Sequence, residues 1–252
     1  MLARAACETW CVKPENGRLD HRLERLKAAR LYLICDDRGD AFLEAALRGG
    51  VDIVQLRLKE TSDEEIAAAG RRFARIGAAH RALFILNDRP ELVARCAADG
   101  VHVGQEDAPV AQARAVAGPE RLVGLSTHTP EQVERASGGD AAPDYIGVGP
   151  VYETPTKPGR KAVGLDLVRY AAGHARLPFF AIGGVNQENV ARVREAGAER
   201  VAVVRALTEA SDPELVARRL RKALTAEGER EPLVAAANQK PPIAEGGQGG
   251  AA

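Results

Sequence analysis

Residues 52–87 read DIVQLRLKETSDEEIAAAGRRFARIGAAHRALFILN, and this stretch decides the fold. It opens with a short apolar run, DIVQLRL at 52–58, and closes with another, ALFILN at 82–87. Between them, DEEIAAAGRRFARIGAAH at 63–80 has apolar residues at helical spacing. Two parallel strands need a crossover connection, which a helix of this length supplies. The stretch therefore predicts a β-α-β unit.

The same unit recurs along the chain. Helical patterns between the apolar runs include ELVARCAA at 91–98 and NVARVREAG at 189–197. Repetition of strand and helix predicts a closed, parallel (β/α)8 TIM barrel of the α/β class. A doubly wound open sheet is the alternative, but CDDRGDA at 35–41 is not the G-x-G-x-x-G turn expected there. The strand-like runs occupy 30–36, 52–58, 82–87, 100–104, 121–126, 144–149, 178–184 and 200–204.

The two ends of the chain differ from the predicted barrel domain at 30–224. The extension at 1–29 contains a basic amphipathic segment, HRLERLKAAR at 21–30, which predicts a short helix. This helix either closes the bottom of the barrel or forms a surface arm. Residues 225–252 are rich in Gly, Ala, Pro and Gln, a composition that predicts a disordered tail.

The amino-acid composition limits the classes of function that the protein can have. Lys plus Arg and Asp plus Glu each number 35, so no global field would attract nucleic acid or an anionic membrane. Of the four cysteines only Cys7 and Cys11 lie close together, without the second pair of a zinc site. We see no apolar signal segment and no run of about 20 apolar residues. We expect a cytoplasmic enzyme without nucleic-acid or membrane partners, and leave a homo-oligomer open.

Polar residues near the second strand point to an anion. In a (β/α)8 barrel the reactive groups lie at the C-terminal ends of the strands. Gln55, Arg57 and Lys59 alternate with apolar residues, so a period of two places all three on the inner face. Cations there must line a wet mouth or meet an anionic ligand. The alternative is a solvent-facing edge strand with incidental charges.

Two carboxylates follow the next two strands. Asp88 lies after the third apolar run and Asp107 after the fourth, which places them on neighbouring loops. Two carboxylates that face a polyphosphate are a common way to hold Mg²⁺. Taken singly, each could instead cap a helix that begins at Pro90 or Pro109. Together with the nearby cations they predict a magnesium site.

The last four strands end in residues suited to a second anion. Ser126 ends the fifth run, where its hydroxyl could contact ligand or cap a helix near Pro130. Gly183-Gly184 and Val204-Arg205 end the seventh and eighth runs. Backbone N–H groups of these two loops commonly bind phosphate in this fold. We interpret His102, inside GVHVG, as a core side chain rather than a ligand.

The long loop GPVYETPTKPGRKAVG at 149–164 follows the sixth run. It exceeds the usual connection of about 4–6 residues. Its position between the two predicted sites would let Thr154, Thr156 and Lys157 reach over both ligands. A cover of this kind suits a water-sensitive intermediate.

These motifs together resemble the thiamine-phosphate synthase family, also called thiamine-phosphate pyrophosphorylase. The matching segments are QLRLK at 55–59, NDR at 87–89, GVHVGQED at 100–107, STH at 126–128, GPVYETPTK at 149–157 and AIGGV at 181–185. The resemblance implies a transferase of thiamine biosynthesis. It would join 4-amino-5-hydroxymethyl-2-methylpyrimidine diphosphate to a thiazole phosphate, giving thiamine phosphate and pyrophosphate.

The resemblance also implies roles for individual residues. Arg57, Lys59 and Lys157, with Mg²⁺, would neutralise the departing pyrophosphate while the aminopyrimidine stabilises the cation left behind. One position departs from the family, because Arg205 stands where a serine is usual. The alternatives are a thiazole tautomerase or regulatory relative that does not couple, and a sugar-phosphate isomerase or epimerase barrel. The implied contacts are Gln55, Arg57, Lys59, Asn87, Ser126 and Lys157 for the pyrimidine diphosphate, Asp88 and Asp107 for Mg²⁺, and Thr154, Thr156, Gly184, Val204 and Arg205 for the thiazole phosphate.

Overall fold

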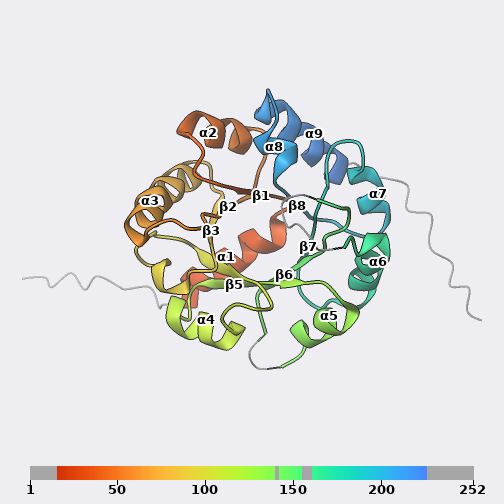
Figure 1. Cartoon of the computed structure of the whole chain (residues 1–252), viewed down its shortest axis with the longest axis horizontal. Helices are drawn as coiled ribbons and strands as arrows, with labels where there is room; N and C mark the ends of the chain where they lie inside the picture. Colours follow the sequence, from red (N-terminus) through yellow and green to blue (C-terminus); the bar gives the residue numbers. More distant parts are fainter. Residues whose placement is uncertain (1–15, 140–141, 155–160, 226–252) are drawn as a thin grey trace, which may run out of the picture.

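A computed structural model describes residues 16–139, 142–154 and 161–225. Its strands form a closed parallel barrel in the order β1 to β8, with helices around the outside (Figure 1). The predicted (β/α)8 barrel is confirmed, and the open-sheet alternative is wrong. The strands are β1 Leu31–Cys35, β2 Ile53–Leu56, β3 Leu83–Asn87, β4 Gly100–Val103, β5 Leu122–Thr127, β6 Tyr145–Val148, β7 Phe179–Ile182 and β8 Val201–Val203.

The helices follow the strands in the expected order. The best-formed start is that of α3, where Ser62 accepts from the backbone N–H of Glu65 and the Glu65 side chain accepts from that of Ser62. This reciprocal capping box satisfies two N–H groups that a helix start leaves unbonded. The helices are α1 Asn16–Ala28, α2 Asp40–Arg48, α3 Asp63–Ala79, η1 Pro90–Leu92, α4 Val110–Ala117, α5 Pro130–Ala136, α6 Gly164–His174, α7 Val190–Glu195, α8 Arg205–Thr208 and α9 Pro213–Thr225.

The helix predicted from ELVARCAA does not form. The structure has only the 3₁₀ turn η1, followed by turns that end at Ala97 with φ of 54°. Pairing with the neighbouring strand resumes soon afterwards, where the N–H of Asp99 donates to the carbonyl of Phe84 at 2.7 Å. Leu92, Val93 and Cys96 are nevertheless buried, so the segment fills a helix position with turns.

The strands divide the core into two layers. Leu33, Val54 and Phe84 face the surrounding helices and belong to the larger apolar cluster. Tyr32 and Ile53, their neighbours along the chain, face the barrel interior and belong to the smaller cluster. This is the period-two alternation of β-strands.

Helix α1 closes the N-terminal end of the barrel. Leu26 and Ala29, at 1% exposure each, join the interior cluster. Arg22 forms an ion pair with Asp99 at 2.9 Å and donates to the carbonyl of Glu120 at 3.1 Å. Figure 1 shows α1 crossing the middle of the strand ring. The first interpretation of this helix is confirmed, and the surface-arm alternative is wrong.

In the described part of the chain, every helix is too short or too polar to cross a membrane.

Candidate active site

The polar residues at and after strand β2 follow the predicted inward–outward alternation only in part. Gln55 faces the interior at 2% exposure and donates from Nε2 to the hydroxyl of Tyr32 at 2.6 Å. The strand ends at Leu56, so Arg57 and Lys59 lie beyond it, half-buried and exposed respectively. The period-two argument therefore holds for Gln55 and stops there. A barrel without edges excludes the edge-strand alternative.

The two cations after β2 have no ion-pair partner among the residues that the structure describes. Within the described ranges, neither Arg57 nor Lys59 has a carboxylate within 4.0 Å, whereas many other arginines do. The charge of Arg57 nevertheless reaches Asp88, where it opposes a rise in the pKa of that carboxyl. The chain thus keeps two positive side chains at the mouth, where an anionic ligand could meet them.

Asp88 and Asp107 come together as predicted. Burial first, then the charge and hydrogen bonding of Asp107, raises the pKa of Asp88 to about 6. Asn87 donates to Asp88 at 2.5 Å, and the backbone N–H of Gly104 donates to Asp107 at 2.7 Å. Asp88 also has φ of 58°, a conformation that Asp tolerates better than most residues. The backbone thus holds two like charges together.

The capping alternatives for these polar residues are wrong. The residue before η1 is Arg89 and the residue before α4 is Pro109, and in neither case does a side chain cap the helix. Helix α5 is capped by Thr129, which accepts from the N–H of Gln132, rather than by Ser126. Asp88, Asp107 and Ser126 are therefore available for a role at the mouth.

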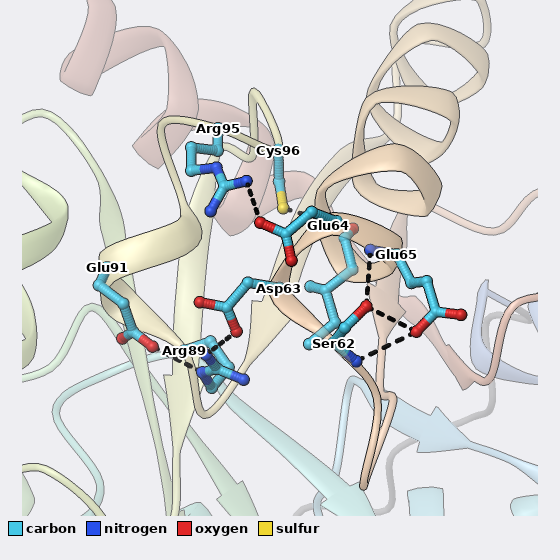
Figure 2. Close-up of polar contacts among 9 residues, drawn as sticks. Ser62, Asp63, Glu64, Glu65, Arg89, Glu91, Arg95 and Cys96 are labelled. Carbon is cyan, nitrogen blue, oxygen red and sulfur yellow. Dashed lines mark hydrogen bonds and ion pairs between the residues drawn. The ribbon is translucent and has the colours of Figure 1, made fainter.

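Ion pairs fasten the loop after β3 to the start of α3 (Figure 2). Arg89, next to Asp88, pairs with Asp63 in the first turn of α3 and with Glu91 at 2.6 Å. Arg95 and Glu64 add a second pair across the same two segments at 3.4 Å. These contacts fix the loop of Asp88 relative to the loop that carries Arg57 and Lys59.

A cavity of about 300 Å³ lies on the other side of the mouth. A volume of this size suits a small molecule. Its wall includes Ser126 from β5, Gly184 after β7, and Val204 and Arg205 after β8, and also Thr154 from the long loop. The structure therefore brings together the described residues predicted for the thiazole phosphate. Thr156 and Lys157 lie outside the described residues.

Two glycines shape this cavity. Gly183 and Gly184 have φ of 101° and 66°, which favours glycine at both positions. A Cβ on Gly183 would lie 2.5 Å from Cα of Pro150, and one on Gly184 would lie 2.7 Å from Cβ of Tyr152. The loops after β6 and β7 can therefore pack closely only with glycine here.

Sequence reasoning missed several side chains near the mouth. His128, Asn186 and Glu209 also line the cavity. The STH motif at 126–128 contained a signal for His128, whereas the other two carried none. His102, interpreted as a core side chain, is partly buried and bonds to the hydroxyl of Ser126 at 3.0 Å.

These features define a class of protein. A (β/α)8 barrel with cations, a carboxylate pair and a glycine-walled cavity at the strand ends has the layout of an enzyme for phosphorylated small molecules.

Comparison with known proteins narrows the class. The family model described as thiamine monophosphate synthase matches residues 31–207. The chain belongs to that family. It is 50% identical over 221 residues to a thiamine-phosphate synthase of Mycobacterium bovis, with 80% of this chain and 97% of the relative covered. It is 45% identical over 209 residues to that of Thermosynechococcus vestitus, covering 82% of this chain but only 59% of the relative's length.

A solved structure agrees with this assignment. A thiamine phosphate pyrophosphorylase from Pyrococcus furiosus matches with a TM-score of 0.72 and 30% identity. The match covers 80% of this chain and 97% of that one.

Proposed function

We propose that this chain joins 4-amino-5-hydroxymethyl-2-methylpyrimidine diphosphate to a thiazole phosphate, giving thiamine phosphate and pyrophosphate. The names of its relatives support this reaction. The observation that carries the proposal is the division of the mouth into two parts. Arg57, Lys59 and the Asp88–Asp107 pair lie on one side, and the glycine-walled cavity lies on the other. Such a mouth can hold a diphosphate and a monophosphate at once.

The diphosphate belongs on the side of β2 to β4. Arg57 and Lys59, which lack ion pairs within the described ranges, would bind its oxygens. Asn87 and Ser126, at the ends of β3 and β5, would contact the substrate as well, and Gln55 would meet the pyrimidine ring from inside the barrel. We assign Lys157 to the same diphosphate from sequence.

The carboxylate pair fits a magnesium ion. Burial and the neighbouring Asp107 raise the pKa of Asp88, and a cation bound between the two carboxyl groups would offset that like-charge repulsion. Among the described residues no group of three or more His, Cys, Asp or Glu side chains could hold a metal, so substrate oxygens and water would complete the coordination. When bound, Mg²⁺ would offset the negative charge that develops on the pyrophosphate.

The chemistry needs no side-chain nucleophile. The bond between the methylene carbon and the diphosphate oxygen breaks, and its electron pair leaves with pyrophosphate. Arg57, Lys59 and Lys157 stabilise that charge, and the hydroxyl of Ser126 donates a hydrogen bond to the substrate. The thiazole nitrogen then donates its electron pair to the methylene carbon and forms the new C–N bond. No proton is transferred in either step.

The thiazole phosphate belongs in the cavity. Backbone N–H groups at Gly184, Val204 and Arg205 would bind the phosphate, with Thr154 and, from sequence, Thr156 beside it. The side chain of Arg205 is exposed at the cavity wall, and the described residues show no ion pair between it and Glu209. It could therefore reach an anion there. The Asp88–Asp107 pair favours coupling over a tautomerase or regulatory role, neither of which needs a diphosphate site.

The decisive experiment is incubation of the full chain with both substrates and Mg²⁺, followed by measurement of pyrophosphate and thiamine phosphate. We expect both products in equal amounts. Asp88→Ala and Asp107→Ala should each lower kcat/KM by at least about 10²-fold, because each removes a metal ligand. Two results would contradict the metal assignment. One is full activity of the wild-type protein without divalent cations, and the other is an unchanged Mg²⁺ dependence in both variants. A cytoplasmic location remains a prediction.

A further inference from the structure

A continuous chain of hydrogen bonds crosses the barrel interior beneath the mouth. Gln55 donates from Nε2 to the hydroxyl of Tyr32 at 2.6 Å, and the hydroxyls of Tyr32 and Tyr145 lie 3.0 Å apart. Nδ1 of His102 lies 3.2 Å from the hydroxyl of Tyr145, and its Nε2 lies 3.0 Å from Oγ of Ser126. The chain therefore joins β2 to β5 through side chains of β1, β6 and β4.

The barrel makes room for this chain. Tyr32 and Tyr145 are 2% and 0% exposed, and both pack edge-on against Phe180, with ring centroids 5.3 and 5.7 Å away. A Cβ at position 124 would lie 2.2 Å from the Tyr145 ring and 2.5 Å from Nδ1 of His102, so only glycine fits there. A close-packed interior holds these polar groups in one arrangement.

The bond from Gln55 sets the direction of every other bond. Burial raises the pKa of both tyrosines, so each hydroxyl keeps its single proton. Since Tyr32 accepts from Gln55, its proton goes to Tyr145. The proton of Tyr145 then goes to Nδ1 of His102, and a neutral ring protonated at Nε2 donates to Ser126.

The two ends of the chain then present opposite characters to a ligand. Gln55 has used an N–H and keeps its carbonyl oxygen as an acceptor, whereas Ser126 has accepted a bond and keeps its proton to donate. An exocyclic amino group is a donor and matches the carbonyl of Gln55. A 4-oxopyrimidine has an acceptor at that position, and it would require Gln55 to rotate and every bond in the chain to reverse.

We propose that the Tyr32–Tyr145–His102 chain positions Gln55 and Ser126 so that the mouth selects a 4-aminopyrimidine diphosphate over its 4-oxo analogue. This rests on the proposed function, because the pyrimidine contacts of Gln55 and Ser126 are taken from it. Tyr32, Tyr145 and His102 are positioning residues, since they act through the side chains at the two ends.

The test measures binding of the 4-amino and 4-oxo pyrimidine diphosphates by calorimetry, with Mg²⁺ and without thiazole phosphate. We expect the wild type to prefer the amino compound by at least about 100-fold, since a site built for a donor rejects an acceptor. Tyr32→Phe and Tyr145→Phe should each reduce that preference at least tenfold, because Gln55 becomes free to rotate. Phe180→Leu disturbs the same aromatic cluster without removing a hydrogen bond, so it should lower Tm and keep the preference.

A second measurement reports directly on the direction of the hydrogen bonds from Tyr32 to Ser126. Nitrogen-15 NMR of histidine at pH 8 should show His102 protonated at Nε2 in the wild type, with its signal assigned by its loss in His102→Gln. The Tyr145→Phe variant should show a changed tautomer population. Preferences within twofold of wild type in both tyrosine variants would overturn the proposal, as would His102 protonated at Nδ1 in the wild type. Absence of thiamine phosphate in the coupling assay, with the binding preference intact, would instead overturn only the proposed function.

Discussion

Asp88→Asn should stabilise the metal-free protein at neutral pH while it lowers activity. The pKa of Asp88 rises from 3.8 to about 6 in the folded protein, chiefly through burial and then through Asp107. A folded protein that binds a proton more tightly than the unfolded chain gains stability as pH falls through about 6 toward 4. Above that window the ionised carboxylate destabilises the fold.

The magnitude follows from this difference in pKa. Each pKa unit corresponds to about 1.4 kcal/mol, so the full effect at pH 7.5 is about 3 kcal/mol. Asp88 is only half-buried, and screening by solvent reduces this to about 1–2 kcal/mol. Asparagine cannot ionise, tolerates the φ of 58°, and still accepts from Asn87. A gain of that size raises Tm by about 2–8 °C in a domain of this length.

The assay is thermal unfolding followed by circular dichroism in EDTA at pH 7.5 and pH 4.5. We expect Asp88→Asn to have the higher Tm at pH 7.5 and to lose roughly two thirds of that advantage at pH 4.5, where the folded carboxyl is protonated but the unfolded one is still mostly ionised. Asp166→Asn is the control, because its side chain is 95% exposed and pairs with Arg169 on the surface. A Tm for Asp88→Asn equal to or below that of the wild type at pH 7.5 would refute the reasoning.

Three further predictions concern other parts of the chain. Arg22→Ala should lower the free energy of unfolding by about 1–3 kcal/mol, because it breaks a largely buried ion pair with Asp99, and urea unfolding measures this. Both KM values should stay unchanged in steady-state kinetics, because the substrates bind at the opposite end of the barrel. Arg205→Ala should raise KM for the thiazole phosphate by the equivalent of about 1.5–3 kcal/mol and leave KM for the pyrimidine diphosphate unchanged. Arg205→Ser should recover part of the lost thiazole phosphate affinity. Affinities of both variants within twofold of wild type would mean that the backbone alone holds the phosphate. Lys157→Ala should depress the chemical step, measured in single-turnover reactions, more than thiazole phosphate binding, and a loss confined to binding would make it a general binding residue.

The sequence located most of the candidate site because the fold imposes a simple rule. Once the alternation identified eight strands, the residues at each C-terminal end had to meet at one mouth. Asp88 and Asp107 were paired by that rule, and Gln55 was placed inward by its parity in β2. The parity argument did not extend to Arg57 and Lys59, since nothing local in DIVQLRL shows that the strand ends at Leu56.

The sequence by itself therefore determined the order of the strands, the barrel and the rim positions, because these depend on local periodicity. Only the tertiary structure decided which interior side chains touch. The hydrogen-bond chain from Gln55 through Tyr32, Tyr145 and His102 to Ser126 joins five strands, and its Tyr32–Tyr145 contact crosses the barrel between β1 and β6. Such contacts depend on closure of the sheet and on the space that Gly124 leaves, and neither has a signature in any short stretch of sequence.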